Sequence, residues 1–260
     1  MIKKKTRTTE ADWRNAIKDI SLIVSREHIE ELAAQTLEYV KANVSGNVVL
    51  SYSAGKDSIV LEHLLRPLGF KSIMAYCDLE YPCFMNWVRE NAPDGLMLIN
   101  SGQNLKWLSE HEEMLFPDNS AKAGRWYDIV QHRVQNKYIQ DNAVDFLILG
   151  RRLADGNFCG KNGIYKKGSC SVISPLYKWT HEDILAYIYY YELPLPPIYD
   201  FADGYKQGTH NWASYILYDG MTKDQALERL WKIDKNIILE AKEQIALIER
   251  WYNDNRNNLD

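Results

Sequence analysis

The hexapeptide Ser-Ala-Gly-Lys-Asp-Ser at residues 53–58 constrains this chain more than any other feature. It follows the apolar run Val48–Leu50, which is typical of a buried strand, and it precedes a helical pattern over Ile59–Leu65. A turn of small residues between a strand and a helix presents backbone N–H groups and a helix N-terminus to an anion. The sequence therefore predicts a phosphate-binding loop at the carboxyl end of a strand.

The small residues of the loop suit this chemistry. Gly55 lets the backbone approach a phosphate closely, and Ala54 is small enough to do nearly the same. Ser53 and Ser58 are predicted to add hydroxyl donors to the backbone N–H groups. The helix is predicted to begin at about Ser58, so that its N-terminus completes the anion site.

Lys56 and Asp57 are the charged residues of the loop. Lys56 supplies a positive point charge for phosphate. Asp57 cannot bind phosphate directly, and we interpret it as a Mg²⁺ ligand, direct or through water, or as a cap for the loop. The pattern is not the Walker type, which needs four residues between its first glycine and its Gly-Lys pair. The alternative interpretation is an ordinary strand-to-helix turn with an N-cap.

Short apolar strands alternate with helical patterns on both sides of the loop. The predicted strands are Val48–Leu50, Ser72–Tyr76, Leu96–Ile99 and Phe146–Leu149, and the predicted helices between them include Ile59–Leu65, Phe84–Asn91 and Asp128–Asp141. This alternation is typical of a parallel sheet covered on both faces, with right-handed crossovers. The predicted fold class is therefore α/β, a doubly wound and mostly parallel sheet with helical additions at both ends.

Three parts are expected along the chain. Residues 1–45 are predicted to be an N-terminal helical segment, 46–205 the nucleotide-binding α/β domain, and 206–260 a C-terminal helical extension. Near the end of the middle part, Thr180 is a predicted N-cap, with Asp183 three residues on, for a helix that runs to about Tyr191.

Composition limits the classes of partner. A net charge of −4 and a pI of about 5.9 argue against a general nucleic-acid coat, so nucleic acid is disfavoured as a partner without being excluded. The sequence has no run of about 20 apolar residues that would cross a bilayer. Its four cysteines are too widely spaced for a metal knuckle. We therefore expect a cytoplasmic protein with reduced thiols and no membrane partner, and a homo-oligomer is left open.

Four segments together resemble a known family. Residues 53–58 look like the Ser-Gly-Gly-Lys-Asp-Ser signature of the PP-loop ATP pyrophosphatases, or adenine nucleotide alpha hydrolases. Residues 76–82 resemble the Asp-Thr-Gly-x-x-x-Pro segment of the phosphoadenosine phosphosulfate (PAPS) reductase branch. Residues 149–155 resemble its Gly-x-Arg-x-x-(Glu/Asp) segment, and residues 174–184 its Pro-Leu-x-x-Trp-Thr-x-x-Asp stretch. The segments occur in the family's order between about residues 48 and 205.

The resemblance implies roles for residues beyond the loop. The backbone around Asp78 and Leu79 would receive the adenine, and Arg125, Arg151 and Arg152 would reach phosphate or sulfate oxygens. Guanidinium groups fork onto oxyanions and neutralise the charge on a leaving pyrophosphate. The alternative for the paired arginines is a solvated turn after a strand.

The candidate residues form two groups. The candidate catalytic residues are Lys56, Asp57, Arg151 and Arg152, with Asp57 also the candidate metal ligand. The candidate nucleotide-binding residues are Ser53, Ala54, Gly55, Lys56, Asp57, Ser58, Asp78, Leu79, Arg125 and Gly150. The implied ligands are ATP or a related adenine nucleotide, and Mg²⁺.

The chain departs from the family's pattern in its cysteines. The reductases use a thiol near the chain terminus, but this chain has no cysteine after Cys170. It carries Arg-Trp-Tyr at 125–127 where the family often has Arg-Trp-Cys, and Gly-Thr-His-Asn-Trp at 208–212 where the family has Gly-Cys-x-x-Cys. An iron–sulfur cluster needs four thiolates at suitable spacing, so none is expected.

The remaining thiols leave two interpretations open. Cys159 and Cys170 flank a Gly-rich, basic stretch at 160–168, which is expected to be a hairpin or a flexible loop over the site. Nearby lysines would lower a thiol pKa and favour a reactive thiolate. Alternatively, the two cysteines are small apolar fillers. Cys77 and Cys83 are interpreted as packing residues.

Three functional hypotheses follow. The first is an ATP-using enzyme of the transferase class that cleaves at the α-phosphate, adenylylates an acceptor and releases pyrophosphate. The second is a sulfonucleotide reductase or sulfurtransferase, which the resemblance favours and the cysteine pattern opposes. The third is a non-catalytic nucleotide-binding partner subunit, because a fold does not fix a function. The acceptor or partner protein is not identified by the sequence.

Overall fold

The computed structural model describes residues 8–218 and 220–258, and these form two compact units. The first unit comprises the described residues up to 74, together with 86–99 and 135–209. The second comprises 75–85, 100–134 and the described residues from 210 onwards. This division follows contacts in space and not the order of residues along the chain. The expected domain boundaries at residues 45 and 205 therefore stay a prediction.

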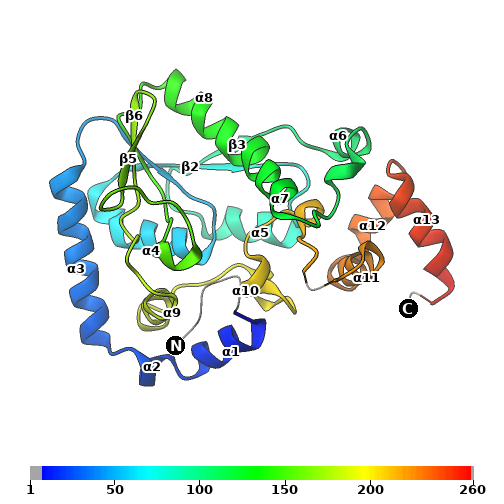
Figure 1. Ribbon diagram of the computed structural model, residues 1–260, viewed down its shortest axis with the longest axis horizontal. Coiled ribbons are helices and arrows are strands. Elements are labelled where there is room, and N and C mark those ends of the chain that lie inside the picture. The colour runs from blue at the N-terminus through cyan, green and yellow to red at the C-terminus, as the bar shows by residue number, and fades with distance from the viewer. Residues whose placement is uncertain (1–7, 219, 259–260) are drawn as a thin grey trace. The chain divides into compact units, whose positions relative to one another are not determined.

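A six-stranded, mostly parallel sheet forms the centre of the fold, with helices on both sides (Figure 1). Its strands are β1 (Val48–Ser51), β2 (Lys71–Tyr76), β3 (Met97–Asn100), β4 (Phe146–Ile148), β5 (Ile164–Lys167) and β6 (Cys170–Ile173). Their order is β3-β2-β1-β4-β6-β5. β1 is parallel to β2 and β4, β4 is parallel to β6, and β5 pairs antiparallel with β6. The predicted α/β fold class is confirmed.

The β5–β6 hairpin is the part of the sheet that sequence periodicity did not assign. We expected a hairpin or a flexible loop here, and the structure shows a hairpin whose second strand continues the parallel sheet beside β4. All four residues of β6 are buried, whereas β5 is half-exposed at the sheet edge. An antiparallel edge strand on a parallel sheet is common in folds of this class.

The strand order places the loop at a switch point. The chain leaves β1 toward β2 and β3 on one side, and it returns to β4 on the other side of β1. Ligands of open α/β sheets bind beyond the carboxyl ends of the strands where the order reverses in this way. Residues 52–55 connect β1 to α4 (Lys56–Leu65) at this point. The predicted position of the loop is confirmed, and the helix begins two residues earlier than expected.

Helices α4 and α8 (Arg133–Asp141) cover opposite faces of the sheet (Figure 1). On the α8 face, Ile139 packs with strand residues that include Val49, Leu147 and Val172 in one buried cluster. On the α4 face, α9 (His181–Tyr190) packs against α4 and against the N-terminal helices α1 (Glu10–Lys18), α2 (Ile20–Ile23) and α3 (Arg26–Asn43). The N-terminal helices therefore add a second layer of helices on the face of the sheet that α4 covers.

Local capping decides where the other helices begin. They are α5 (Pro82–Asn91), α6 (Leu105–Ser109), α7 (Ser120–Tyr127), α10 (Gly204–Gln207), α11 (Lys223–Ile233), α12 (Lys235–Ala241) and α13 (Ala246–Asn255). The helix expected over Asp128–Asp141 is π-helical at Asp128–His132 and continues as α8. It follows α7 directly, so the helical stretch begins eight residues earlier than expected, where the side chain of Asn119 caps α7. The helical pattern near the C-terminus is three helices, since Asp234 and Ile245 have extended backbones.

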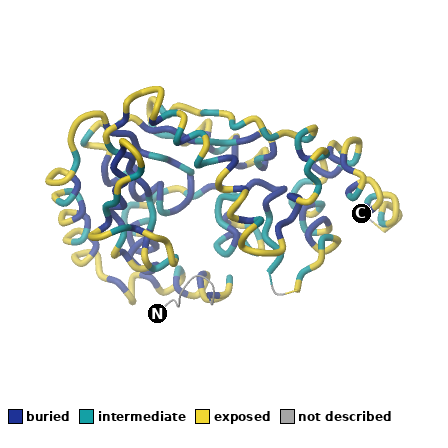
Figure 2. Tube along the Cα trace, turned by 45° about the horizontal axis from the view of Figure 1, so that its top comes forward, coloured by how far each residue is buried: buried dark blue, intermediate teal, exposed yellow. Residues whose placement is uncertain are grey.

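Burial follows this layering. Figure 2 shows the buried residues in the interior of the trace and the exposed ones on outer turns and helix faces. Among the described residues, no helix combines the length and the apolar character that crossing a membrane would need.

Candidate functional site

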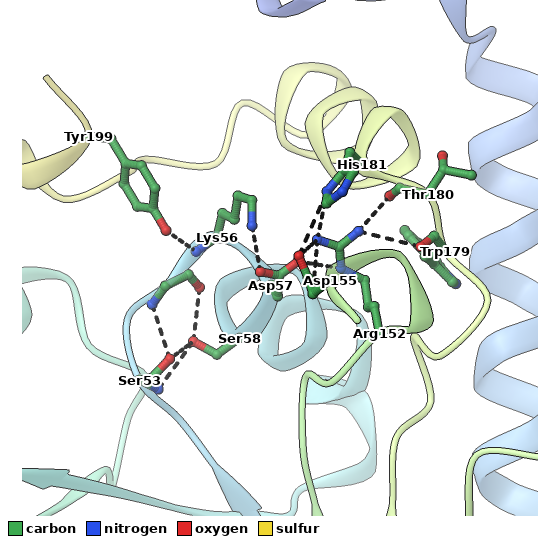
Figure 3. Close-up of polar contacts among 11 residues, drawn as sticks. Ser53, Lys56, Asp57, Ser58, Arg152, Asp155, Trp179, Thr180, His181 and Tyr199 are labelled. Atoms are coloured by element: carbon green, nitrogen blue, oxygen red, sulfur yellow. Dashed lines mark hydrogen bonds and ion pairs between the residues drawn. The ribbon is translucent and has the colours of Figure 1, made fainter. Parts of the chain in front are cut away.

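The loop leads from β1 into α4 through one residue in the left-handed region, and Figure 3 shows the polar contacts around it. Ala54 has a φ of 52°, in the left-handed region, although it stands where the resembling signature has a glycine. It is fully buried. Gly55 is the N-cap of α4 and has no side chain to occupy the N–H groups of the first turn. Backbone donors and the positive end of the helix dipole therefore meet at this point.

The two serines of the loop bind the loop itself. The Ser53 N–H donates to Ser58 Oγ at 3.1 Å, and the two hydroxyl oxygens lie 3.2 Å apart. Ser58 Oγ donates to the Gly55 carbonyl at 2.9 Å. These hydroxyls fix the shape of the turn, and their predicted direct contact with phosphate stays a prediction.

Lys56 is buried at the start of α4, with 6% of its surface exposed. Its Nζ lies 2.7 Å from Asp57 Oδ2 and 5.3 Å from the ring centroid of Trp13, which comes from α1. Its backbone N–H donates to the hydroxyl of Tyr199 at 2.8 Å. An aromatic face and a carboxylate both attract an ammonium group, so the lysine of the loop is held by three partners from three parts of the chain.

Arg152 links the loop to the segment after β4. Its Nε lies 2.7 Å from Asp57 Oδ1, a charge pair without hydrogen-bond alignment, and its Nη2 lies 3.0 Å from Asp155 Oδ2. The Arg152 side chain is fully buried, whereas Asp57 is 22% exposed. One guanidinium therefore pairs with two carboxylates, and together with Lys56 it balances their two negative charges, as buried charges require.

The start of α9 completes the environment of Arg152. Its Nη1 donates to the carbonyl of Thr180 at 2.9 Å and lies 3.4 Å from that of Trp179. Its Nη2 lies 3.2 Å from Nδ1 of His181. Because arginine has only donors, His181 must accept at Nδ1 and carry its proton on Nε2. Figure 3 shows how this guanidinium joins the loop to α9.

His181 stays neutral near pH 7. Burial, reinforced by the positive charge of Arg152, lowers its pKa from 6.5 to about 4. Between these values the unfolded chain binds more protons than the folded one, so the free energy of unfolding must fall as the pH falls through this window. The His181 contribution is fully present above pH 6.5 and is lost toward pH 4, with a size of up to about 3 kcal/mol.

This pH dependence can be measured by urea unfolding. We expect the difference in the free energy of unfolding between the wild-type protein and a His181→Asn variant to change between pH 7 and pH 4.5. Asparagine keeps an acceptor near Arg152 and does not titrate. A difference that stays constant over this range would show that His181 is not buried as a neutral ring.

The residues around Asp57 do not fit a protein-held Mg²⁺. Each oxygen of the Asp57 carboxylate lies 2.7 Å from a cationic nitrogen, one from Lys56 and one from Arg152. Among the described residues there is also no group of three or more His, Cys, Asp or Glu side chains that could hold a metal ion. Mg²⁺ prefers several oxygen ligands free of competing cations. We therefore assign no step to a metal on Asp57.

Two other predicted residues lie beside the loop. A Cβ at Gly150 would come within 3.3 Å of the Asp57 backbone, so this glycine allows the end of β4 to pack against the start of α4. Arg151 is half-exposed, and its Nη1 lies 3.1 Å from the Tyr165 hydroxyl. The expected phosphate contacts of both arginines stay predictions. Their burial favours Arg151 for a ligand and Arg152 for a positioning role.

Asp78, Leu79 and Arg125 belong to the second unit. The Asp78 N–H donates to the carbonyl of Gln103 at 2.9 Å, and the Leu79 carbonyl accepts from the N–H of Trp212 at 3.2 Å. Arg125 on α7 is 59% exposed. The structure therefore brings together the loop, Gly150 and the two arginines after β4 within the first unit. Asp78, Leu79 and Arg125 lie in the second unit and are described on their own.

The thiols are protonated at neutral pH. Burial raises the pKa of Cys159, of Cys170 and of Cys83, and it raises that of Cys77 well above its usual range. Cys170 belongs to the buried cluster under α8. Of the two interpretations of Cys159 and Cys170, the apolar filler is the one that these environments favour.

Sequence reasoning missed several residues near the loop. Trp13, Tyr199 and His181 contact Lys56 or Arg152, and a Cβ on Gly55 would meet Oγ1 of Thr209 at 3.3 Å. In the second unit, burial raises the pKa of Glu80 to about 7. The sequence did carry one signal for His181, Tyr199 and Glu80, namely their position inside or beside the family-like segments. For Trp13 the sequence carried none.

The comparisons with known proteins agree with the fold and the loop. The chain belongs to the phosphoadenosine phosphosulfate reductase domain family, whose model matches residues 47–215. This confirms the resemblance inferred from the four segments. No curated protein sequence matches the chain significantly.

Solved structures with related folds have low sequence identity. PAPS reductase from Candida auris, in a phosphate complex, is 16% identical with a TM-score of 0.50, over 68% of this chain and 92% of that one. This likeness shows the fold. U34-tRNA thiolase NcsA from Methanococcus maripaludis is 14% identical, over 85% of this chain and 79% of that one, with a TM-score of 0.46. NMN synthetase from Francisella tularensis is 15% identical, over 90% and 95%, also with a TM-score of 0.46.

Proposed function

We propose that the protein binds ATP or a related adenine nucleotide at residues 53–58 and cleaves it at the α-phosphate. The acceptor would be adenylylated and pyrophosphate released. The observation that supports this proposal is the first turn of α4, whose N-cap Gly55 has no side chain to bind its N–H groups, behind a left-handed residue at position 54. Family membership supports nucleotide binding at the same place.

In the proposed reaction the protein mainly positions the reacting groups and stabilises negative charge. An acceptor oxygen or nitrogen attacks the α-phosphorus, the bond to the bridging oxygen breaks, and its electron pair leaves with pyrophosphate. The backbone N–H groups of α4 and the half-exposed Arg151 are suited to hold the developing negative charge. Lys56 can add a further positive charge if a phosphate competes with Asp57 for its ammonium group.

The state of the thiols supports this proposal over sulfonucleotide reduction. Reduction needs a thiolate nucleophile, and burial raises the pKa of all four cysteines. The ammonium group of Lys56 is already held by Trp13 and Asp57 and is therefore not free to act on a phosphate. This supports a second candidate, a subunit that binds a nucleotide without turning it over.

One set of measurements separates these candidates. Purified protein is incubated with ATP and Mg²⁺, pyrophosphate is quantified with and without cell extract, and bound nucleotides are identified by mass spectrometry. Pyrophosphate release supports adenylyl transfer, whereas tight binding without release in either case supports the non-catalytic subunit. If neither ATP nor a 3′-phosphorylated adenine nucleotide binds at millimolar concentration, the proposal is wrong.

A Gly55→Ala variant tests the loop directly. The new Cβ would lie 3.3 Å from Ser53 Oγ and from Thr209 Oγ1, so it would fill space beside the first-turn N–H groups. Gly55 has a φ of −78°, which alanine tolerates. We expect nucleotide affinity to fall about tenfold, the loss of roughly one charge-assisted hydrogen bond. Isothermal titration calorimetry with ATP measures this change.

Gly124→Ala is the matched control. Gly124 lies in α7 on the surface, and a Cβ there would meet nothing within 4 Å. This substitution is expected to stabilise the helix by about 0.5–1 kcal/mol and to leave nucleotide affinity unchanged. If the Gly55→Ala and Gly124→Ala variants bind ATP with equal affinity, the loop is not part of the nucleotide site.

A further inference from the structure

The segment from 151 to 180 has a charge opposite to that of the whole chain. It holds six basic side chains, Arg151, Arg152, Lys161, Lys166, Lys167 and Lys178, and one acidic side chain, Asp155. Arg152 and Asp155 pair with each other in the interior. The segment is therefore basic overall, in a chain with a net charge of −4.

An aromatic pair of one exposed and one half-buried ring lies within this basic segment. Phe158 is 68% exposed, and its ring centroid lies 5.1 Å from that of Tyr165 on β5, with the planes tilted by 59°. The Tyr165 hydroxyl in turn contacts Nη1 of Arg151 at 3.1 Å. Two aromatic rings and a guanidinium thus adjoin one another. We refer to Arg151, Phe158, Lys161 and Tyr165 as the basic aromatic edge.

The backbone holds Phe158 in this exposed position. Its neighbour Cys159 is buried. Gly160 and Gly163 both have positive φ, and a Cβ on either would come within 3 Å of other atoms, the Ile164 carbonyl for Gly160 and the Tyr177 ring for Gly163. The close packing of this turn fixes its path, so the outward direction of Phe158 is a property of the fold.

The basic aromatic edge lies at the same end of the sheet as residues 53–58. Ile164 on β5 pairs with Ile173 at the end of β6, and Ile173 pairs with Ile148 at the end of β4. Ile148 pairs with Leu50 of β1, from which the loop follows. A ligand on this edge would therefore lie along the carboxyl ends of the strands, in the same unit as the loop.

From these observations we infer that the basic aromatic edge binds single-stranded nucleic acid. Proteins bind single strands by combining cations for the phosphates with aromatic side chains on which bases stack. Lys161 is exposed and Arg151 is half-exposed, and Phe158 and Tyr165 supply the rings. An acidic peptide would use the cations but would leave the exposed ring of Phe158 without a stacking partner. This surface goes beyond the proposed nucleotide chemistry and does not depend on it.

Fluorescence anisotropy with a fluorescein-labelled 12-nucleotide single strand tests the inference. DNA and RNA versions of one sequence are compared, because only a contact to the 2′-hydroxyl distinguishes them. With the two cations of this edge on phosphates, the logarithm of the affinity should fall with the logarithm of salt concentration with a slope of about −1.4. Phe158→Ala is expected to weaken binding about tenfold.

Matched variants separate this surface from general electrostatics. Tyr189→Ala removes another exposed aromatic ring, on α9, and Lys71→Ala removes an exposed cation at the amino end of β2; neither should change the affinity. Lys161→Ala should reduce the magnitude of the salt slope by about 0.7. Absence of binding at 50 mM salt overturns the inference. Equal affinities of Phe158→Ala and Tyr189→Ala also overturn it, as does heparin binding that is unaffected by Phe158→Ala and competes fully with the strand.

The two proposals fail separately. ATP affinity is measured on the same samples. A protein that binds ATP but no single strand contradicts only the basic aromatic edge. A protein that binds the strand but no adenine nucleotide contradicts only the proposed function.

Discussion

Replacing Arg152 with alanine is expected to lower the free energy of unfolding by about 3–5 kcal/mol. The guanidinium is fully buried and lies within 3.0 Å of oxygens from Asp57 and Asp155. It also donates to the Thr180 carbonyl and to His181. Its removal leaves two carboxylates near each other without their shared cation, and this is the costliest way to break a buried ion pair. Urea unfolding followed by circular dichroism at pH 7 measures the loss.

Two variants separate the position of Arg152 from its charge. Arg151→Ala removes the same side chain one residue earlier, where it is half-exposed and contacts Tyr165, and it should cost less than about 1 kcal/mol. Arg152→Lys keeps the charge but has one nitrogen in place of three, so it should recover only part of the stability. Equal losses for Arg151→Ala and Arg152→Ala would contradict the described network.

A spectroscopic measurement gives an independent test. The positive charge of Arg152 is, after burial, the largest cause of the lowered pKa of His181. In Arg152→Lys the remaining charge lies farther from the imidazole, so the pKa of His181 should move back toward 6.5 from about 4. Titration by NMR measures this shift in a variant that still folds. An unchanged His181 pKa would mean that burial alone sets it.

The loop could be predicted from sequence because it is local. An apolar strand, a small-residue turn and a helix start are encoded within Val48–Leu65, and the left-handed conformation of Ala54 follows from the turn itself. The capping box of Thr180 and Asp183 was predicted for the same reason. Both features depend on hydrogen bonds between residues at most five positions apart.

The partners of the loop could not be predicted in the same way. Lys56 contacts Tyr199, which is 143 positions away, and Arg152 contacts His181, 29 positions away. The family resemblance implied a phosphate role for Arg152, and nothing local in the sequence indicated that its side chain is buried. Its burial depends on the packing of α9 against α4, and β6 likewise became a strand through pairing with β4. Such long-range contacts leave no periodic pattern.

Trp13 illustrates this limit and carries the second large prediction. Its ring is 1% exposed, faces the ammonium of Lys56, contacts the edge of His181 with centroids 4.7 Å apart, and stacks on Tyr205. α1 is fixed there by Glu10, which accepts from the N–H groups of Tyr205 and Lys206 at 3.0 and 3.1 Å. The N-terminal helix is therefore part of the environment of the loop.

We expect Trp13→Ala to lower the free energy of unfolding by about 3–5 kcal/mol, the usual cost of removing a large buried ring. Trp13→Phe keeps an aromatic face over Lys56 and should cost less. The change should also expose Lys56, whose side chain is only 7% exposed in the wild-type protein. Brief acetylation followed by peptide mass spectrometry, under conditions where each variant is folded, measures this exposure against the exposed Lys18.

The expected order of Lys56 acetylation is low in the wild type and in Trp13→Phe, and high in Trp13→Ala, with Lys18 modified equally in all three. Loss of the cation–π contact would also return Lys56 to solvent, where it could reach a phosphate with less competition. If Lys56 is acetylated as fast as Lys18 in the wild-type protein, then α1 does not cover the loop. A tight phosphate site would then need no movement of the N-terminal helix. A protected Lys56 would mean that a nucleotide bound as proposed has to displace Trp13 or Asp57 from the ammonium group.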